Sequence, residues 1–227
     1  FEEECPPCKL IDVGNAKRSP QYGPKRRGRP WPLIRWKYNN VGESMKIIDL
    51  RKENKELIEQ TAVILYESFK DITEAWPTMV LARDEVYESI GEDKISRIAV
   101  NDDNVVQGWI GGKSMYNGNV WELHPLVVKR EHRGQGIGKV LVNDLEEKVK
   151  ERGGLTIWLG TDDEYNSSSL SNTDLYENLY EKIVNIRNLK RHPFEFYQEL
   201  GFIIVGVMPD ANGIGKPDIY MAKKVRR

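Results

Sequence analysis

The sequence predicts an α+β domain in which one mixed, mostly antiparallel sheet carries helices on both of its faces. Three observations support this prediction. Apolar runs that suit strands, separated by polar turns, follow one another between residues 95 and 129. Apolar residues recur at the spacing of an amphipathic helix between residues 54 and 70. A strand also leads into a glycine-rich turn and then a helix in WELHPLVVKREHRGQGIGKVLVNDLEEKV, residues 121–149.

The first half of the predicted domain contains four strands and two helices. The strands are MKIIDL (45–50), ISRIAV (95–100), VVQGWIGGKSM (105–115) and residues 119–129. NDDN is the turn between the second and the third strand. Residues 54–70 and 78–90 are the helices. The apolar face of the first helix is formed by Leu57, Ile58, Ala62, Leu65, Tyr66 and Phe69.

The second half begins with a helix over residues 136–152, which RGG ends. Its core-facing residues are Val140, Leu141, Leu145 and Val149. LTIWLG (155–160) is a buried strand, an acidic-then-basic helix follows over 174–190, and Pro193 begins a short helix that ends at Leu200. FIIVGVM and DIYMAK then form a hairpin, since Asn212-Gly213 between them is a hairpin signal.

The first 44 residues differ in character from the rest of the chain. Nine of the 34 basic and five of the 35 acidic residues lie there, which leaves 25 basic and 30 acidic residues in 45–227. The leader is rich in Gly, Pro and Arg without any period, so we expect a disordered arm, or a non-native leader upstream of a true start at Met45. The acidic domain disfavours nucleic acid as its main partner, although Trp31 and Trp36 among the leader's arginines leave nucleic-acid binding by the arm open.

Both cysteines, Cys5 and Cys8, lie in this leader as CPPC. A redox motif would need a βαβ context, and a zinc site would need two further ligands, whereas the nearest histidine is His124. We therefore expect no metal. No apolar run reaches the roughly 18 residues that a membrane span needs, so a cytoplasmic location is expected.

The glycine turn predicts an anion site. Without a Cβ at Gly134, Gly136 and Gly138, a ligand can approach the backbone closely, and the helix that begins there adds the positive end of its dipole. A Walker loop is excluded because Val140 follows Gly138-Lys139 where a hydroxyl is required. A dinucleotide fold would place its glycines after the first strand of the domain. The glycines alone are also consistent with a turn that has only a structural role.

The context of this turn resembles that of the GCN5-related N-acetyltransferase superfamily. More closely, WELHPLVV, RGGLTIWLGTDD, LSNTDLYE, HPFEFYQELGF and VGVMPDANGIGKPDIYMAK are similar to bacterial aminoglycoside 6′-N-acetyltransferases, and the resemblance covers residues 45–227. It implies that the turn binds the pyrophosphate of acetyl-coenzyme A, with no metal. The cofactor-binding residues that it implies are Val127, Val128, Arg133, Gly134, Gln135, Gly136, Ile137, Gly138 and Lys139. It also implies a homodimer, with the hairpin at 202–224 available for pairing.

Acetyl transfer needs a base, a polarised thioester and an acid for the thiolate. Glu122 is the candidate base, through a water, and His124 shares its face of the strand. Pro125 predicts a bulge or splay that would free the N–H of Leu126 for the thioester oxygen and that of Val128 for the pantetheine amide. In the superfamily, a tyrosine at the position of Tyr197 protonates the thiolate.

Acidic residues after the strand LTIWLG suit a polycationic acceptor. Asp162, Asp163 and Glu164 are the main candidates there, and Glu74 and Trp76 are weaker ones between the first two helices. Together these features predict acetylation of the 6′-amine of aminoglycoside antibiotics, as a resistance enzyme. Acetylation of a protein or peptide amine, and a non-catalytic acetyl-coenzyme A sensor, stay open as alternatives.

Overall fold

A computed structural model of the chain describes residues 36–37, 44–70 and 75–225, all of which belong to one compact unit, residues 33–227. Most of the predicted leader lies outside the described residues, including Cys5, Cys8 and Trp31, and so does Glu74. Two leader residues, Trp36 and Lys37, form a short strand that pairs with residues 44 and 45.

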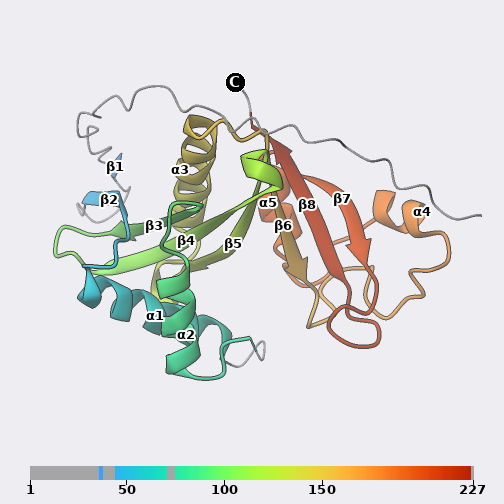
Figure 1. The fold of residues 1–227 in the computed structure, drawn as a ribbon. Helices are drawn as coiled ribbons and strands as arrows, with labels where there is room; N and C mark the ends of the chain where they lie inside the picture. Colours follow the sequence, from blue (N-terminus) through green and yellow to red (C-terminus); the bar gives the residue numbers. More distant parts are fainter. Residues whose placement is uncertain (1–35, 38–43, 71–74, 226–227) are drawn as a thin grey trace, which may run out of the picture. The chain divides into compact units, whose positions relative to one another are not determined.

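The described strands form one sheet in the order β1-β2-β3-β4-β5-β6-β8-β7 (Figure 1). All neighbours are antiparallel except β5 and β6, so the predicted mixed, mostly antiparallel sheet is confirmed. The strands are β1 Trp36–Lys37, β2 Ser44–Asp49, β3 Lys94–Val100, β4 Val106–Met115, β5 Val120–Val128, β6 Thr156–Asp162, β7 Ile203–Met208 and β8 Asp218–Lys224.

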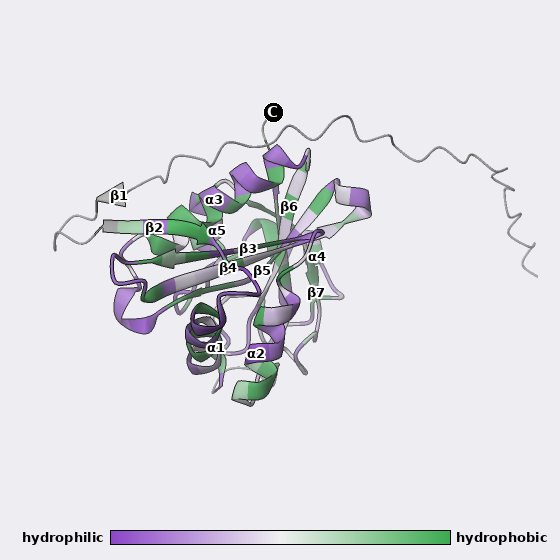
Figure 2. Ribbon diagram, turned by 60° about the vertical axis from the view of Figure 1, so that its left-hand side comes forward, coloured by the Kyte–Doolittle hydropathy of each residue, from purple (hydrophilic) through white to green (hydrophobic). Residues whose placement is uncertain are grey.

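Helices lie on both faces of the sheet, as predicted (Figure 1). They are α1 Lys55–Phe69, α2 Met79–Glu88, α3 Ile137–Glu151, α4 Leu179–Val184 and α5 Phe194–Glu199, with short 3-10 turns at Tyr116–Gly118 and Arg130–His132. One core cluster joins α1 and α2 to the sheet, and a second contains residues of α3 and α5. In Figure 2 the helices combine hydrophobic and hydrophilic residues, as expected for helices that cover a sheet on one side only.

The predicted helix over residues 174–190 is wrong in length, since α4 covers only Leu179–Val184. Asn178 has a left-handed conformation (φ 52°) immediately before α4. After α4, backbone groups bond to the preceding loop instead of continuing the helix: Leu189 N donates to the Ser167 carbonyl at 2.7 Å, and Arg187 N donates to Ser169 Oγ at 2.9 Å. These loop contacts satisfy the backbone in place of helical hydrogen bonds.

The other predicted elements agree with the structure to within a few residues at each end. The hairpin of β7 and β8 is present, with a longer connection than a two-residue turn: Met208 pairs with Asp218, and Gly213 has a φ of 111° within the loop. Among the helices of the described residues, none is long and apolar enough to cross a membrane.

Candidate active site

The parallel strands β5 and β6 separate partway along their length. Their pairing consists of Val120 with Thr156, Trp121 with Ile157 and Glu122 with Trp158, and it ends there. From this point β6 stays paired with β8 as far as Asp162 opposite Asp218, while β5 stays paired with β4 as far as Val128. Figure 1 shows the two strands diverging. The second half of β5 therefore has one edge that is not paired with β6.

A bulge in β5 lies at the point of divergence, where Pro125 predicted one. The register jumps from Ile110 opposite Leu126 to Gly112 opposite Leu123, so Gly111 lies opposite two residues of β5. A Cβ on Gly111 would overlap the carbonyl oxygen of His124, which explains the glycine.

The bulge decides which way the end of β5 presents its backbone. Lys129 N donates to the Gln107 carbonyl at 2.9 Å, in the same register in which Val128 lies opposite Gly108 and Leu126 opposite Ile110. Because N–H groups along an antiparallel strand alternate in direction, those of Leu126 and Val128 point away from β4. They face the edge that β6 has left.

The glycine turn directly follows this strand. Gly134 and Gly136 have φ values of 74° and 86°, which is the left-handed region that favours glycine. Apart from its two chain neighbours, no atom of the described residues would lie within 4 Å of a Cβ on Gly134, so the space above this residue is open. The next helix, α3, begins at Ile137, and its first turn has N–H groups without partners in the helix.

Side chains around the turn hold it in place. Arg133 donates from Nε to the Val128 carbonyl at 3.0 Å and from Nη2 to Ser68 Oγ at 3.1 Å, which ties the turn to β5 and α1. Gln135 Nε2 donates to the Glu131 carbonyl at 3.2 Å. Ile137 is buried in the core, and Lys139 is exposed. Glycine backbone, a helix N-terminus and two exposed cations together suit a diphosphate.

Tyr197 is brought to the same end of the molecule by α5, which packs on the first turn of α3. A Cβ on Gly138 would lie 3.3 Å from Phe196 Cζ and 3.8 Å from Val128 Cγ2, so the glycine lets the neighbouring helix approach. Tyr197 is 8% exposed, and its ring packs against the rings of Phe196 and Phe202. Burial raises the pKa of Tyr197, so its phenol keeps its proton.

Glu122 and His124 lie on β5 beside the bulge. Glu122 is half-buried and lies opposite Lys113 on one side and Trp158 on the other. His124 is exposed, and its ring centroid is 5.6 Å from that of Trp76. Trp76 is mostly buried, and its Nε1 donates to Glu85 Oε2 at 3.3 Å, so it forms a wall behind His124.

A pair of carboxylates lies farther along the same face of the sheet as Glu122. Trp158 shares that face as the cross-strand neighbour of Glu122, and Asp162 shares it because it lies four residues farther along β6. Asp162 lies opposite Asp218 of β8. Sequence reasoning missed Asp218, because only the pairing register of two strands distant in sequence brings it there.

The surroundings of this pair disfavour a second negative charge. Burial, and then the neighbouring Asp162, raise the pKa of Asp218 to about 6. Asp218 Oδ1 is buried without a hydrogen-bond partner among the described residues. Asp162 accepts a hydrogen bond from Asn212 Nδ2 at 2.6 Å. A cation would compensate both carboxylates.

Asp163 and Glu164, predicted to hold the substrate, have other partners. Asp163 is 1% exposed and accepts hydrogen bonds from the backbone N–H groups of Ser167 and Ser168 and from the Ser171 hydroxyl. It organises the loop, and we correct its assignment accordingly. The Glu164 carboxylate pairs with Lys216 at 3.1 Å. Within the described ranges, no group of three His, Cys, Asp or Glu side chains could hold a metal ion.

Comparison with known proteins agrees with this geometry. Residues 62–182 match the model of the Acetyltransferase (GNAT) family. No curated protein matches the chain. Among solved structures, an aminoglycoside 6′-N-acetyltransferase complexed with coenzyme A is 42% identical, with a TM-score of 0.73 over 80% of this chain and 97% of the other. The aminoglycoside 6′-N-acetyltransferase from Enterococcus faecium is also 42% identical over the same shares of the two chains, with a TM-score of 0.74.

A third similar structure is aminoglycoside 6′-acetyltransferase type Ii, which is 35% identical over 80% of this chain and 97% of its own length, with a TM-score of 0.61. The resemblance found in the sequence is thus confirmed both for the superfamily and for the similarity to its aminoglycoside branch. The chain belongs to the Acetyltransferase (GNAT) family.

Proposed function

We propose that the protein transfers the acetyl group of acetyl-coenzyme A to the 6′-amine of aminoglycosides, and that this reaction confers resistance. One observation carries the proposal: the edge of β5 beyond Glu122 leads into the glycine turn, α5 with Tyr197 packs on the first turn of α3 through Phe196, and the sheet face of Glu122 continues to Asp162 and Asp218. A donor site and a polycation site therefore meet at Glu122. The similarity to three aminoglycoside acetyltransferases supports the choice of acceptor.

The residues present fit acetyl-coenzyme A. Residues 134–139 would hold its diphosphate through backbone N–H groups and the dipole of α3, with Arg133 and Lys139 adding positive charge. The Val128 N–H would pair with a pantetheine amide as a strand pairs with its neighbour, and Val127 would hold this part of β5 in place from the core. The acetyl thioester, when bound there, supplies the activated carbonyl carbon.

Four groups of this chain would act on the reacting atoms. Glu122 takes a proton from the substrate ammonium through a water, so that the free amine can attack. The Leu126 N–H donates to the thioester oxygen as negative charge develops on it. The new C–N bond would form as the C–S bond breaks, and Tyr197 would give its proton to the departing thiolate. The second proton, which the nitrogen loses as it becomes an amide, would return to the Tyr197 phenolate. His124, exposed beside Trp76, orients the water or the acceptor.

The acceptor is proposed to lie along the sheet face that begins at Glu122. Asp162 lies four positions after Trp158 on β6, which corresponds to about 13 Å. A molecule of linked amino sugars can span this length, with the reacting amine at Glu122 and another ammonium group between Asp162 and Asp218. Ion pairs at the half-buried Asp218 are screened less by salt than pairs on an open surface.

We propose further that two copies associate through β7. β7 is an edge strand of the sheet, and none of its six residues is charged. Ile203 and Val205 are 65% and 57% exposed. An apolar edge strand is a ready site for pairing with another strand, and a second copy offers the same strand. Sedimentation should show a dimer that Val205→Lys dissociates, and a monomeric parent chain would refute this proposal.

The test of function is the release of coenzyme A thiol from acetyl-coenzyme A in the presence of different amines. We expect rapid release with aminoglycosides and slow release with peptides that carry a free N-terminus or lysine. Release with peptides alone would favour acetylation of a protein amine. Binding of acetyl-coenzyme A without release for any amine would favour a sensor.

A further inference from the structure

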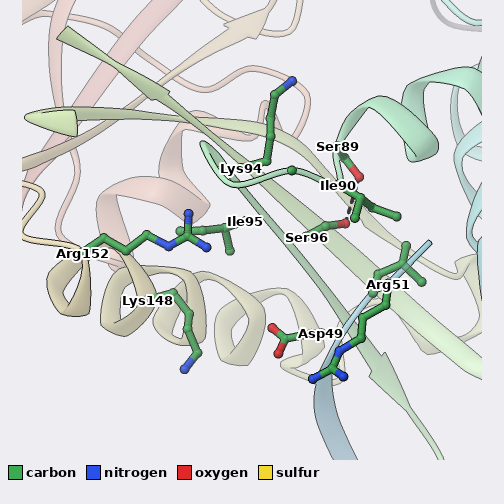
Figure 3. A pocket seen from close by; sticks show the side chains of 11 residues that line it. Asp49, Arg51, Ser89, Ile90, Lys94, Ile95, Ser96, Lys148 and Arg152 are labelled. Atoms are coloured by element: carbon green, nitrogen blue, oxygen red, sulfur yellow. Dashed lines mark hydrogen bonds between the residues drawn. The ribbon is translucent and has the colours of Figure 1, made fainter. Parts of the chain in front are cut away.

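A separate cavity of about 240 Å³ lies at the opposite end of α3 from the glycine turn (Figure 3). It is lined by residues at the end of β2, at the end of α2, at the start of β3 and in the last turn of α3. The 15 residues of α3 place the two ends about 22 Å apart. The cavity is therefore distinct from the proposed diphosphate site. It also lies on the other face of the sheet from Glu122, because Arg152 contacts the ring of Trp121 and consecutive side chains of a strand point to opposite faces.

Positive charge dominates the lining of this cavity. Four basic residues line it, Arg51, Lys94, Lys148 and Arg152, against one carboxylate, that of Asp49. Asp49 already pairs with Arg97, which donates to it at 2.6 Å, and Lys148 pairs with Glu151 at 3.0 Å. Of the ion pairs formed between described residues, none involves the other three cations. This concentration of positive charge lies in a domain with five more acidic than basic residues.

Arg152 is held in position before any ligand arrives. Its Nη1 donates to the Glu92 carbonyl at 2.9 Å, and its guanidinium lies 5.2 Å from the centre of the Trp121 ring. Figure 3 shows the guanidinium turned inward beside Ile95, whereas the ends of Lys94 and Arg51 extend outward. Its remaining N–H donors suit the two oxygens of a phosphate or carboxylate group.

The hydroxyls in the wall of the cavity are already engaged. Ser89 Oγ donates to the Val86 carbonyl at 2.6 Å and lies 2.9 Å from Ser96 Oγ. Trp109 Nε1 donates to Ser96 Oγ at 2.9 Å. With one proton on each hydroxyl, Ser96 donates to Ser89, and neither serine has a donor left for a ligand. Recognition must therefore come from the cations.

We propose that this cavity binds a compact polyanion, of the size of pyrophosphate or a tricarboxylate. Arg152 engages one anionic group in bidentate fashion, while the flexible Lys94 and Arg51 side chains close over the rest. A single charge cannot engage all these cations, so polyanions bind more tightly than a monocarboxylate at the same ionic strength.

The experiment is calorimetric titration of the full chain with inorganic pyrophosphate, with citrate and with acetate, at constant ionic strength and with saturating coenzyme A. We expect pyrophosphate or citrate to bind in the presence of coenzyme A. The anion that binds more tightly identifies whether the cavity prefers phosphate or carboxylate groups. Arg152→Gln and Lys94→Gln should each weaken binding at least about tenfold, the effect of losing a charge-assisted contact. Lys150→Gln, an equal loss of charge on the exposed surface of the same helix, should change Kd less than about twofold.

Several results would overturn the proposal. They are the absence of binding, acetate binding as tightly as the polyanions, loss of binding when coenzyme A is added, and an equal effect of Lys150→Gln. If Arg152→Gln unfolds the protein through loss of the contact with Trp121, melting curves will show it, and Lys94→Gln then decides.

Discussion

Gly134→Ala separates the role of the glycine turn in folding from its role in binding. Gly134 has a φ of 74°, and a Cβ there would meet no atom of the described residues within 4 Å, its chain neighbours aside. The protein therefore loses only the cost of a non-glycine residue in the left-handed region, about 1–2 kcal/mol. For a chain of this size that cost lowers the melting temperature by about 2–8 °C. A bound diphosphate would occupy the same space. Losing one or two of its backbone hydrogen bonds should weaken coenzyme A binding about 10- to 100-fold.

Gly153→Ala is the matched control. Gly153 has a φ of 78° after the other end of α3, and a Cβ there would also have no neighbour within 4 Å in the part of the chain that the structure describes, its chain neighbours aside. Both variants should lose the same stability in thermal melts, and only Gly134→Ala should lose coenzyme A affinity in calorimetry. Equal coenzyme A affinity in the two variants would refute the assignment of the turn to the diphosphate.

Three further changes test the proposed chemistry. Glu122→Gln should lower the rate at neutral pH by about 10²- to 10⁴-fold, with partial recovery as pH rises and free amine accumulates; an unchanged pH profile would exclude Glu122 as the base. Tyr197→Phe should lower kcat by at least about tenfold with KM for both substrates nearly unchanged, and an equal fall in affinity would indicate a packing role only. For Asp218, whose pKa is raised to about 6 by burial and by Asp162, aminoglycoside affinity should fall as pH drops through 6, because the ligand favours the ionised carboxylate. The stability of the free protein should change in the opposite direction: because the pKa of Asp218 is raised in the folded state, the free energy of unfolding increases as pH falls from 7 towards 4. Asp218→Asn should remove the pH dependence of both affinity and stability. If either dependence persists in the variant, other groups cause it.

Signals carried by neighbouring residues were readable from the sequence. The glycines of the turn need their left-handed backbone whatever surrounds them, and Pro125 disrupts strand pairing wherever it lies. The strands, α1 and α3 follow from apolar spacing within 10 to 15 residues. The prediction of the fold class and that of the anion site at the glycine turn rest on such local features.

Features that depend on distant pairing were not readable. Asp218 faces Asp162 only because β8 pairs with β6 in that register. Asp163 is next to Asp162 in sequence, yet it points into the loop, where three donors satisfy it. The segment after α4 bonds to residues 167–169, so its helical composition does not decide its structure. In each case tertiary contacts outweigh local preference.

Acetyl transfer to the 6′-amine can be tested with a matched pair of substrates. Two aminoglycosides that differ only in carrying an amine or a hydroxyl at the 6′ position are incubated with the protein and acetyl-coenzyme A, and thiol release and product mass are followed. We expect one acetyl group on the 6′-amino compound and no turnover of the 6′-hydroxyl compound. Equal acetylation of both would contradict it.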